Sequence, residues 1–174
     1  MPTAARSLKA RALQWLAQRE QSRVELRRKL LRQARAELAS EEHEERLANV
    51  AEQVDAVLDW LEANGYLSAE RFVESRVHAR AARYGNLRIR QELQQHQLGL
   101  SGELAQTLGA SEIDRARTVR ARRFAELPRD ATERARQARF LIGRGFSPDA
   151  VRAALRGARA DSVEDDSGIT TTGD

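Results

Sequence analysis

Apolar residues recur along this chain at the spacing of amphipathic helices. Between residues 6 and 20 the i, i+4, i+7, i+8 pattern is carried by Leu8, Ala12, Trp15 and Leu16. The clearest stripe precedes Asn64-Gly65 and consists of Val50, Val54, Val57, Leu58 and Leu61. No four or more β-branched residues alternate with polar ones, so no strand is predicted. We therefore predict an all-α fold of about nine short helices.

Capping residues mark where the helices start and stop. Ser22-Arg23-Val24-Glu25 is a capping-box sequence, and Gly145-Phe146-Ser147-Pro148 orders a C′ glycine, an N-cap serine and an N1 proline. Further helices are expected to start at Ser40, Ser68, Ser101 and Ser111 and to span residues 86–97 and 131–143.

The stretch from Ala79 to Leu93 is predicted to join two helices through a sharp elbow. Gly85 is expected at a helix C′ position with positive φ, and Ile89 and Leu93 on one face of the outgoing helix. A solvated helical hairpin is the plainer interpretation of this stretch. The residues assigned to this and related elbows are Tyr84, Gly85, Ile89, Leu93, Gly65, Tyr66, Gly145 and Phe146.

The elbows resemble one another and suggest an internal repeat. When Ser22, Gly85 and Ser147 are aligned, apolar residues follow four and eight positions later in each copy. The phase is not unique, because Leu61-x-x-x-Gly65-Tyr66 also matches Leu141-x-x-x-Gly145-Phe146. Any antiparallel helix pair can look similar, but the repeat favours an elongated, curved array of small helical units.

Charge is segregated along the chain more than the net +4 suggests. Net charges are +8 for residues 1–35, −9 for 36–70, +8 for 71–144 and −3 for 145–174. Only two of the 30 basic residues are lysines, a bias that a GC-rich genome also produces. Arginine forms forked contacts with phosphate and carboxylate, so the segregation favours a polyanion or an acidic protein surface as partner.

The residues offer no credible active site, cofactor site or metal site. There is no cysteine, the histidines (His43, His78 and His96) lack ligand spacing and are expected at the surface, and no glycine-rich phosphate loop is present. No apolar run approaches a membrane span, and the first residues lead directly into a charged helix. We therefore expect a cytoplasmic protein that is not an enzyme and does not bind a membrane.

Nucleic-acid binding has better support. The helix after Ser111 is expected to expose Arg115, Arg117, Arg120, Arg122 and Arg123, which suit phosphate contacts. Trp15, Trp60 and Phe72 lie on apolar stripes and are expected in the core, so few aromatic rings are free to stack on bases. Binding should therefore show weak sequence preference.

Four motifs follow one another along the chain. They are Ala12-Leu13-x-Trp15-Leu16-Ala17-x-Arg19-Glu20-x-Ser22-x-x-Glu25-Leu26-Arg27-x-Lys29-Leu30, Val57-Leu58-Asp59-Trp60-Leu61-x-x-x-Gly65-Tyr66-Leu67-Ser68-x-x-Arg71-Phe72, Arg83-Tyr84-Gly85-x-x-Arg88-Ile89-x-x-Glu92-Leu93 and Arg139-Phe140-Leu141-x-x-Arg144-Gly145-Phe146. Together they resemble the bacterial RecX family, regulators of the RecA recombinase. The resemblance covers about residues 10–156, and its order is specific.

The resemblance implies three tandem three-helix repeats, expected at 1–67, 68–109 and 110–157. The small, polar and acidic residues that follow carry no apolar period, so a disordered acidic tail is expected at 158–174. An acidic insertion near 36–49 and the tail depart from the family pattern. The resemblance also implies binding in the groove of the RecA filament on single-stranded DNA, with weaker double-stranded DNA binding, and, mainly, inhibition of the recombinase, ATPase and coprotease activities in DNA repair and the SOS response. A monomeric regulator of this kind needs no catalytic residues.

Candidate contact residues follow from motif position and local charge. They are Arg83, Arg88, Arg90, Arg120, Arg122, Arg123, Arg139 and Arg144. Some could instead form structural salt bridges, for example with Glu92. A helical-repeat nucleic-acid-binding protein that acts without RecA is the alternative function, and an unrecognised enzyme is a third. The acidic block could also lie against the basic faces and compete with DNA, or be a solvated insertion.

Overall fold

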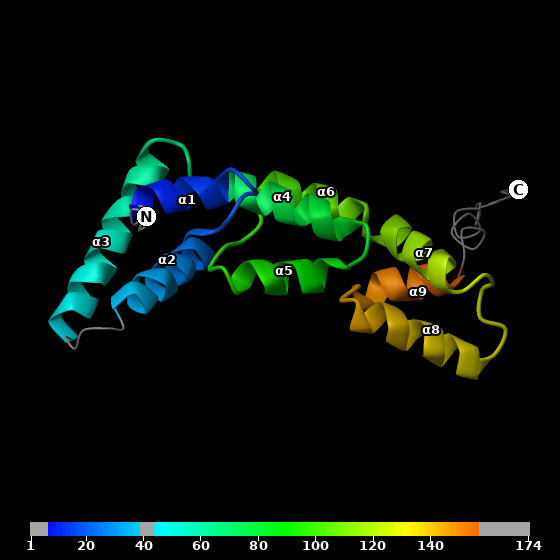
Figure 1. Cartoon of the computed structure of the whole chain (residues 1–174). Coiled ribbons are helices and arrows are strands. Elements are labelled where there is room, and N and C mark those ends of the chain that lie inside the picture. Colours follow the sequence, from blue (N-terminus) through cyan, green and yellow to red (C-terminus); the bar gives the residue numbers. More distant parts are fainter. Residues whose placement is uncertain (1–6, 39–43, 157–174) are drawn as a thin grey trace, which may run out of the picture. The chain divides into compact units, whose positions relative to one another are not determined.

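The computed structural model describes residues 7–38 and 44–156 (Figure 1). Over these residues the chain forms helices and no strand, so the predicted all-α fold is confirmed. No helix in this part of the chain is both long and apolar enough to cross a membrane. The helices are α1 (Leu8–Leu16), α2 (Arg23–Leu38), α3 (Glu44–Ala63), α4 (Ala69–Ala81), α5 (Asn86–Gln94), α6 (Gly102–Ala110), α7 (Glu112–Arg123), α8 (Ala131–Gly143) and α9 (Pro148–Arg156).

Two of the predicted boundaries need comment. The first helix ends at Leu16 rather than near residue 20. The expected insertion is partly helical, because α2 continues to Leu38 and α3 begins at Glu44. Residues 39–43, with the predicted cap Ser40, and the predicted tail at 158–174 lie outside the described residues.

Close contacts group the described residues into two units. The first contains residues 7–38, 44–79 and 92–100, and the second contains residues 80–91 and 101–156. Helices α4 and α5 each contribute to both. The predicted repeat boundaries at 67 and 109 stay a prediction.

The first unit is built on leucine and valine from α1, α2 and α3. Its buried cluster consists of Ala12, Leu26, Leu30, Val54, Leu58, Leu61 and Leu67. Trp15 and Trp60 pack against this cluster and are only half-buried, and the Trp60 ring stacks on Tyr66 with centroids 5.5 Å apart. The aromatic side chains therefore cover the edge of a core that aliphatic residues fill.

Ion pairs join the acidic face of α3 to the basic face of α2. Arg23 contacts Asp59 and Glu62, each at 2.7 Å, and the Arg27 Nε lies 2.7 Å from the Asp55 Oδ1. Part of the acidic block between residues 36 and 70 thus neutralises arginines of its own unit. Exposed pairs of this kind contribute little stability each, but they reduce the positive charge that α2 presents.

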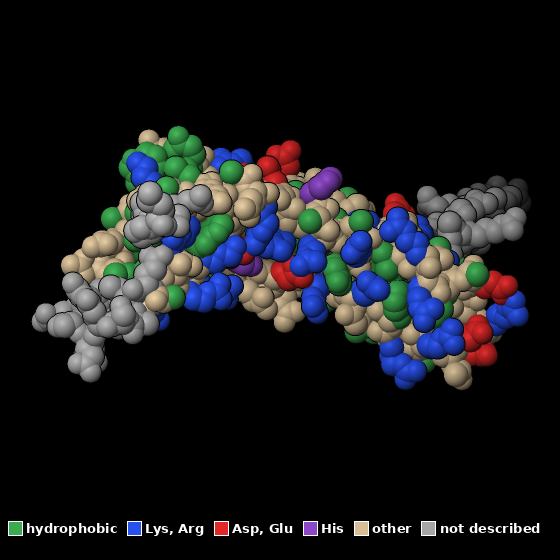
Figure 2. Space-filling view, viewed as in Figure 1, with side chains coloured by type: hydrophobic (Ala, Val, Ile, Leu, Met, Phe, Trp, Pro, Cys, Tyr) green, Lys and Arg blue, Asp and Glu red, His purple; other side chains and the backbone are tan. Residues whose placement is uncertain are grey.

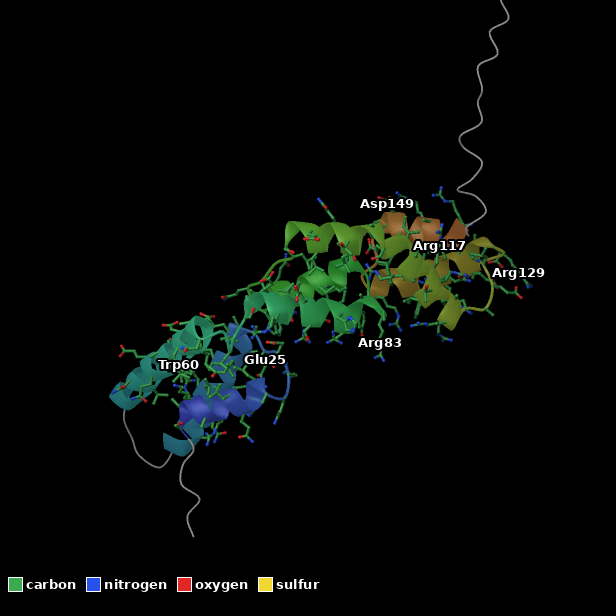
Figure 3. The ribbon with its side chains drawn as sticks, turned by 90° about the horizontal axis from the view of Figure 1, so that it is seen from above. Glu25, Trp60, Arg83, Arg117, Arg129 and Asp149 are labelled. Carbon is green, nitrogen blue, oxygen red and sulfur yellow. The ribbon has the colours of Figure 1, made fainter. Side chains whose placement is uncertain are left out.

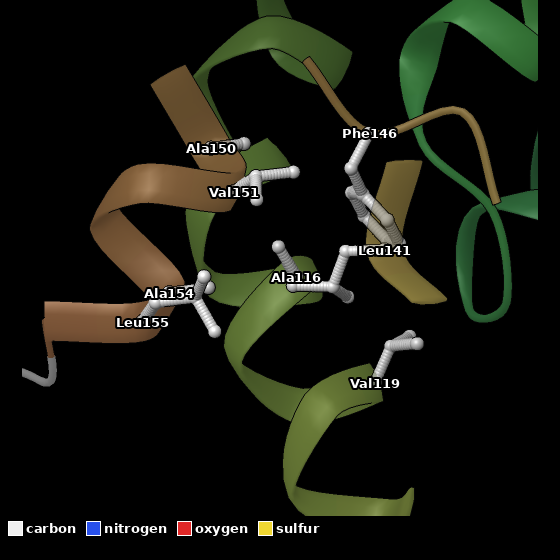
Figure 4. Close-up of a cluster of buried hydrophobic side chains, with 8 residues drawn as sticks. All are labelled: Ala116, Val119, Leu141, Phe146, Ala150, Val151, Ala154 and Leu155. Carbon is white, nitrogen blue, oxygen red and sulfur yellow. The ribbon is translucent and has the colours of Figure 1, made fainter. Parts of the chain in front are cut away.

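The second unit has its core between α7, α8 and α9 (Figure 4). Its buried cluster consists of Ala116, Val119, Leu141, Phe146, Ala150, Val151, Ala154 and Leu155. Small alanines on α7 and α9 let these two helices approach closely. Phe146 follows α8 directly and enters this core, so the turn after α8 is anchored by burial.

Gly65 and Gly145 end their helices in the same way. Gly65 has φ +72° and Gly145 has φ +78°, as expected at a C′ position. The Tyr66 N–H donates to the Leu61 carbonyl at 2.9 Å, and the Phe146 N–H donates to the Leu141 carbonyl at 3.2 Å. These are Schellman motifs, and they confirm the predicted match between the two segments.

A third Schellman motif ends α5 without a glycine. The Leu98 N–H donates to the Leu93 carbonyl at 3.0 Å, and Gln97 has φ +59°. Among the described residues Gln97 alone is a non-glycine with positive φ. A side chain in this conformation is strained. Because glycine is usual at this position, the sequence gives no sign of the motif.

The positions aligned as Ser22, Gly85 and Ser147 all occupy helix N-caps. Each carbonyl accepts from the N–H four residues later, at 2.9, 3.2 and 2.9 Å respectively. They precede α2, α5 and α9. A repeat of three helices would make α2, α5 and α8 equivalent, so α9 does not fit this period. The alignment at Ser147 therefore reflects capping chemistry and not the period of the repeat.

The capping box at Ser22 forms only in part. Its hydroxyl accepts from the Glu25 N–H at 3.1 Å, as predicted. The Glu25 carboxylate accepts from Arg19 (Nη1 to Oε2, 3.2 Å) instead of reaching back to the Ser22 amide. An arginine fork is the stronger partner for a carboxylate, because both groups are charged.

Candidate functional site

The site in the second unit is built where two turns meet. The Gly85 N–H donates to the Arg144 carbonyl at 3.0 Å, and the Leu87 N–H donates to the Gly145 carbonyl at 3.0 Å. These bonds join the α4–α5 turn to the α8–α9 turn, although about 60 residues separate them in sequence. Arg83, Tyr84 and Arg144 are thereby brought together.

Gly85 is required for close approach, and the prediction of a positive φ there was wrong. The described glycines with positive φ are Gly65 and Gly145 alone. A Cβ on Gly85 would lie 2.2 Å from the Gly145 carbonyl oxygen and from the Phe146 N and Cα. Backbone atoms cannot give way as a flexible side chain can, so any larger residue at this junction would have to push the two turns apart.

The buried carboxylate of Glu112 holds the starts of two helices. Glu112 is 7% exposed, and its Oε1 accepts from the Asn86 N–H at 2.8 Å and the Ser147 N–H at 3.3 Å. Its Oε2 accepts from the Ser147 hydroxyl at 2.7 Å. A negative charge suits the N-termini of α5 and α9, where backbone N–H groups lack partners within the helix.

Arg115 is a structural residue, which corrects its expected place on the exposed face of α7. The guanidinium is half-buried and donates to the Tyr84 carbonyl at 2.9 Å, the Leu108 carbonyl at 2.9 Å and the Ala81 carbonyl at 3.2 Å. It also contacts the Asn86 side-chain oxygen. Burial lowers the pKa of Arg115, and the nearby Glu112 opposes this change. The carbonyls at the end of a helix lack partners within that helix, and here they accept hydrogen bonds from the Arg115 guanidinium.

An open groove lies beside this junction. We call it the Tyr84 groove; it has a volume of about 460 Å³. Its lining consists of Ala82, Arg83, Tyr84, Val119, Arg122, Arg123, Phe140 and Arg144. Four of the eight predicted contact arginines thus come together from α7 and the two turns.

Arginines surround the aromatic ring of the groove. The guanidinium carbons of Arg80, Arg88 and Arg144 lie 5.7, 5.8 and 5.9 Å from the Tyr84 ring centroid. Arg144 also lies 4.6 Å from the centroid of Phe140. Such cation–π contacts hold guanidiniums near a ring face without neutralising their charge. The groove therefore combines positive charge with two aromatic side chains.

The arginines of the Tyr84 groove carry no carboxylate partner among the described residues. Arg83, Arg122, Arg123 and Arg144 form no ion pair in this part of the chain, and Arg122 and Arg144 reach only the carbonyls of Ala82 and Arg83, at 3.5 and 3.4 Å. The buried Nε of Arg144 has no hydrogen-bond partner there either. Figure 2 shows Lys and Arg side chains gathered over the α7–α8 end of the chain, and Figure 3 shows Arg83 pointing away from the ribbon.

The other predicted contact residues lie outside the groove lining. Arg88 approaches it through Tyr84, while Arg90 on α5 and Arg139 on α8 are exposed. Arg120 is half-buried and donates to the Glu126 carbonyl at 3.0 Å, which gives it a role in ending α7. This hydrogen bond makes Arg120 a weaker candidate for contact with a partner, because its guanidinium already holds the turn after α7.

Sequence reasoning missed the aromatic part of the groove. Tyr84 was expected only to set the elbow, and Phe140 was noted only within a motif. Phe140 stands one residue before the buried Leu141, a position that directs it beside the core instead of into it. An aromatic residue next to a core position, between Arg139 and Arg144, is the signal that could have identified it.

His96 is not the surface residue that was expected. It is half-buried in the first unit, its Nδ1 lies 2.7 Å from the Ser22 hydroxyl, and its ring lies 4.9 Å from Phe72. Burial lowers the pKa of His96, and the charge of Arg76 lowers it further. His78 is exposed, and His43 lies outside the described residues. No group of three metal-binding side chains occurs in the part of the chain that the structure describes.

Comparison with known proteins identifies the family. A family model described as "RecX, second three-helix domain" matches residues 70–107, and one described as "RecX, third three-helix domain" matches residues 110–155. The regulatory protein RecX of Ralstonia nicotianae is 46% identical over 162 residues, covering 92% of this chain and 93% of that protein. The chain belongs to the RecX family.

Other RecX proteins agree along nearly the whole chain. The regulatory protein RecX of Herbaspirillum seropedicae is 47% identical over 170 residues, covering 95% of this chain and 99% of that protein. That of Leptothrix cholodnii is 47% identical over 152 residues, covering 86% and 88%. The resemblance drawn from the motifs is therefore confirmed, and with it the tandem three-helix domains. RecX relatives are named as regulatory proteins.

Proposed function

We propose that this protein regulates the RecA recombinase by binding the RecA filament on single-stranded DNA, mainly as an inhibitor. Membership of a family of regulatory proteins supports a role through binding and not through chemistry. Within this proposal the protein is a cytoplasmic monomer that restrains recombination, ATP hydrolysis and coprotease activity during DNA repair and the SOS response.

The Tyr84 groove is the surface we assign to the filament. The observation that carries this is its set of four arginines without carboxylate partners among the described residues. Four arginines of the first unit, by contrast, are each paired with an acidic side chain: Arg19, Arg23, Arg27 and Arg71. The exposed arginines of α2 (Arg28, Arg32 and Arg35) are not paired in this way with any described residue. Uncompensated guanidiniums suit phosphates, which they contact in a forked geometry.

Tyr84 and Phe140 add a second element of recognition. Both side chains are half-buried and line the groove, so a base displaced from its neighbours can stack on the exposed part of a ring. Stacking on an aromatic ring tolerates every base, which agrees with the weak sequence preference that we predict for nucleic-acid binding. Arg88, Arg90 and Arg139 extend the positive surface on the helices that lead to the groove.

The first experiment measures ATP hydrolysis by RecA on single-stranded DNA as this protein is added. Inhibition at or below one molecule per RecA protomer is expected. The groove is tested with the double substitution Arg122→Gln and Arg123→Gln, matched by Arg152→Gln and Arg156→Gln on α9, which are exposed and do not line the groove.

The groove variant is expected to inhibit weakly, and the α9 variant to inhibit normally. For binding to a thymidine oligonucleotide, the slope of log Kd against log salt should fall by about 1.4 in the groove variant, because each phosphate contact contributes about 0.7. Full inhibition by the groove variant would refute the assignment of the groove. Salt-dependent oligonucleotide binding without any effect on RecA would favour the alternative, a nucleic-acid-binding protein independent of RecA.

A further inference from the structure

A second groove runs along α2 in the first unit. We call it the α2 groove; its volume is about 650 Å³. Its lining consists of Val24, Arg27, Arg28, Leu31, Arg32, Arg35 and Gln97. The proposed role of the Tyr84 groove leaves this surface unused, since the two grooves share no residue.

The lining residues of α2 form one helical stripe. Val24, Leu31 and Arg35 follow one another at intervals of seven and four residues, so they lie on the same face. The stripe extends over about 16 Å, or three helical turns. This length matches a short helix laid along α2.

The floor of the α2 groove is apolar and held in place. Val24 and Leu31 are half-buried, and Leu31 packs against the buried cluster of the first unit. Arg27 is fixed by a fork to Asp55, with Nε to Oδ1 at 2.7 Å and Nη2 to Oδ2 at 2.9 Å. Its aliphatic stem therefore forms a wall, and its charge is already neutralised.

The rim of the α2 groove is positively charged. Arg28, Arg32 and Arg35 are exposed and form no ion pair with any described carboxylate. Their spacing of four and three residues puts them along one side of the stripe. The surface is thus an apolar strip bordered by three guanidiniums that no carboxylate among the described residues neutralises.

We propose that the α2 groove docks an acidic, amphipathic helical segment of a partner protein. The apolar floor would receive the apolar face of such a helix, and the three arginines would contact its carboxylates. Charge complementarity supports this partner. Nucleic acid fits less well, because no aromatic ring lines the groove to stack on a base. This makes the first unit a protein-binding module separate from the proposed DNA contact.

The test uses a fluorescent synthetic peptide of about four helical turns. Leucines at i, i+3, i+4 and i+7 give it an apolar face, and glutamates occupy most other positions. A scrambled peptide of identical composition has the same charge without that face, and a thymidine oligonucleotide is the third probe. The groove variant combines Arg28→Glu and Arg32→Glu, and the matched control combines Arg122→Glu and Arg123→Glu in the other unit.

The amphipathic peptide should bind the unmodified protein with higher affinity than the scrambled peptide does. Arg28→Glu with Arg32→Glu should weaken that binding about tenfold or more, because charge-assisted contacts are lost. The matched control should leave peptide binding unchanged and weaken oligonucleotide binding. The far-ultraviolet circular dichroism spectrum establishes that both variants are folded.

Three outcomes would overturn the proposal. They are equal binding of the two peptides, peptide binding that is unaffected by the α2 substitutions, and loss of oligonucleotide binding in the α2 variant alone. The last outcome would make the α2 groove a nucleic-acid surface. Failure of RecA inhibition would not affect this test, because the peptide assay contains neither RecA nor DNA.

Discussion

Replacing Glu112 by alanine should destabilise the second unit strongly. The carboxylate is 7% exposed and accepts three hydrogen bonds, from the Asn86 N–H, the Ser147 N–H and the Ser147 hydroxyl. Its removal leaves these donors without their partner in a buried place. With about 1–1.5 kcal/mol lost for each, the free energy of unfolding should fall by about 3–4.5 kcal/mol.

Urea denaturation followed by circular dichroism measures this change. The matched control is Glu133→Ala, since Glu133 is exposed on α8 and accepts one N–H, from Arg129 at 3.0 Å. That variant should lose less than about 1 kcal/mol. Combining Glu112→Ala with Ser147→Ala should cost less than the sum of the two single substitutions, because they share a hydrogen bond.

A cost for Glu112→Ala no larger than that for Glu133→Ala would contradict the anchoring role of Glu112. Glu112→Gln retains the volume and one acceptor oxygen, so it should cost about half as much and still fold. Because Glu112 holds the N-termini of α5 and α9, hydrogen exchange at Asn86 should accelerate in both Glu112 variants. Unchanged exchange there would show that another group satisfies the Asn86 amide.

Three further predictions test the turns and the half-buried imidazole of His96. Gly85→Ala should lower the free energy of unfolding by about 3 kcal/mol, because its Cβ would lie 2.2 Å from backbone atoms. Gly65→Ala should lower it by only about 1 kcal/mol, because a Cβ there has open space and the cost comes from φ +72°. Equal losses in the two variants would contradict the close approach at Gly85. Gln97→Gly should raise the free energy of unfolding by about 1 kcal/mol, since Gln97 has φ +59°, and a loss of stability would refute the strain. Burial and the charge of Arg76 lower the pKa of His96, so the unfolded state binds more protons than the folded state and the free energy of unfolding should fall as the pH drops below about 6.5. His96→Asn should reduce this fall between about pH 7.5 and 5.5. An identical pH dependence in the variant and the unmodified protein would contradict the lowered pKa of His96.

Local patterns predicted most of the helices because their causes are local. Helix α8 was expected at 131–143 and lies at Ala131–Gly143, since Asp130 caps its start and Gly145 ends it. The positive φ angles of Gly65 and Gly145 at the ends of their helices follow from the same short-range rules. The end of α5 was placed three residues too late, because Gln97 adopts a conformation in which glycine is usual.

The candidate site was predictable only in part. Motif position and charge pointed to Arg83, Arg122, Arg123 and Arg144, and the fold brings these four into one groove. The same criteria also selected Arg120, which donates to a turn carbonyl. Charge alone does not distinguish an arginine that faces a partner from one that caps a helix, because both require only an accessible guanidinium.

The sequence by itself determined the all-α class, the positions of most helices, the segregation of charge and the family. These depend on periodicity, capping residues and motifs, all of which act over a few residues. Only the tertiary structure decided the roles of Gly85, Glu112 and Arg115. Their partners lie up to about 60 residues away, on helix ends whose unpaired N–H and carbonyl groups become neighbours only when the chain folds.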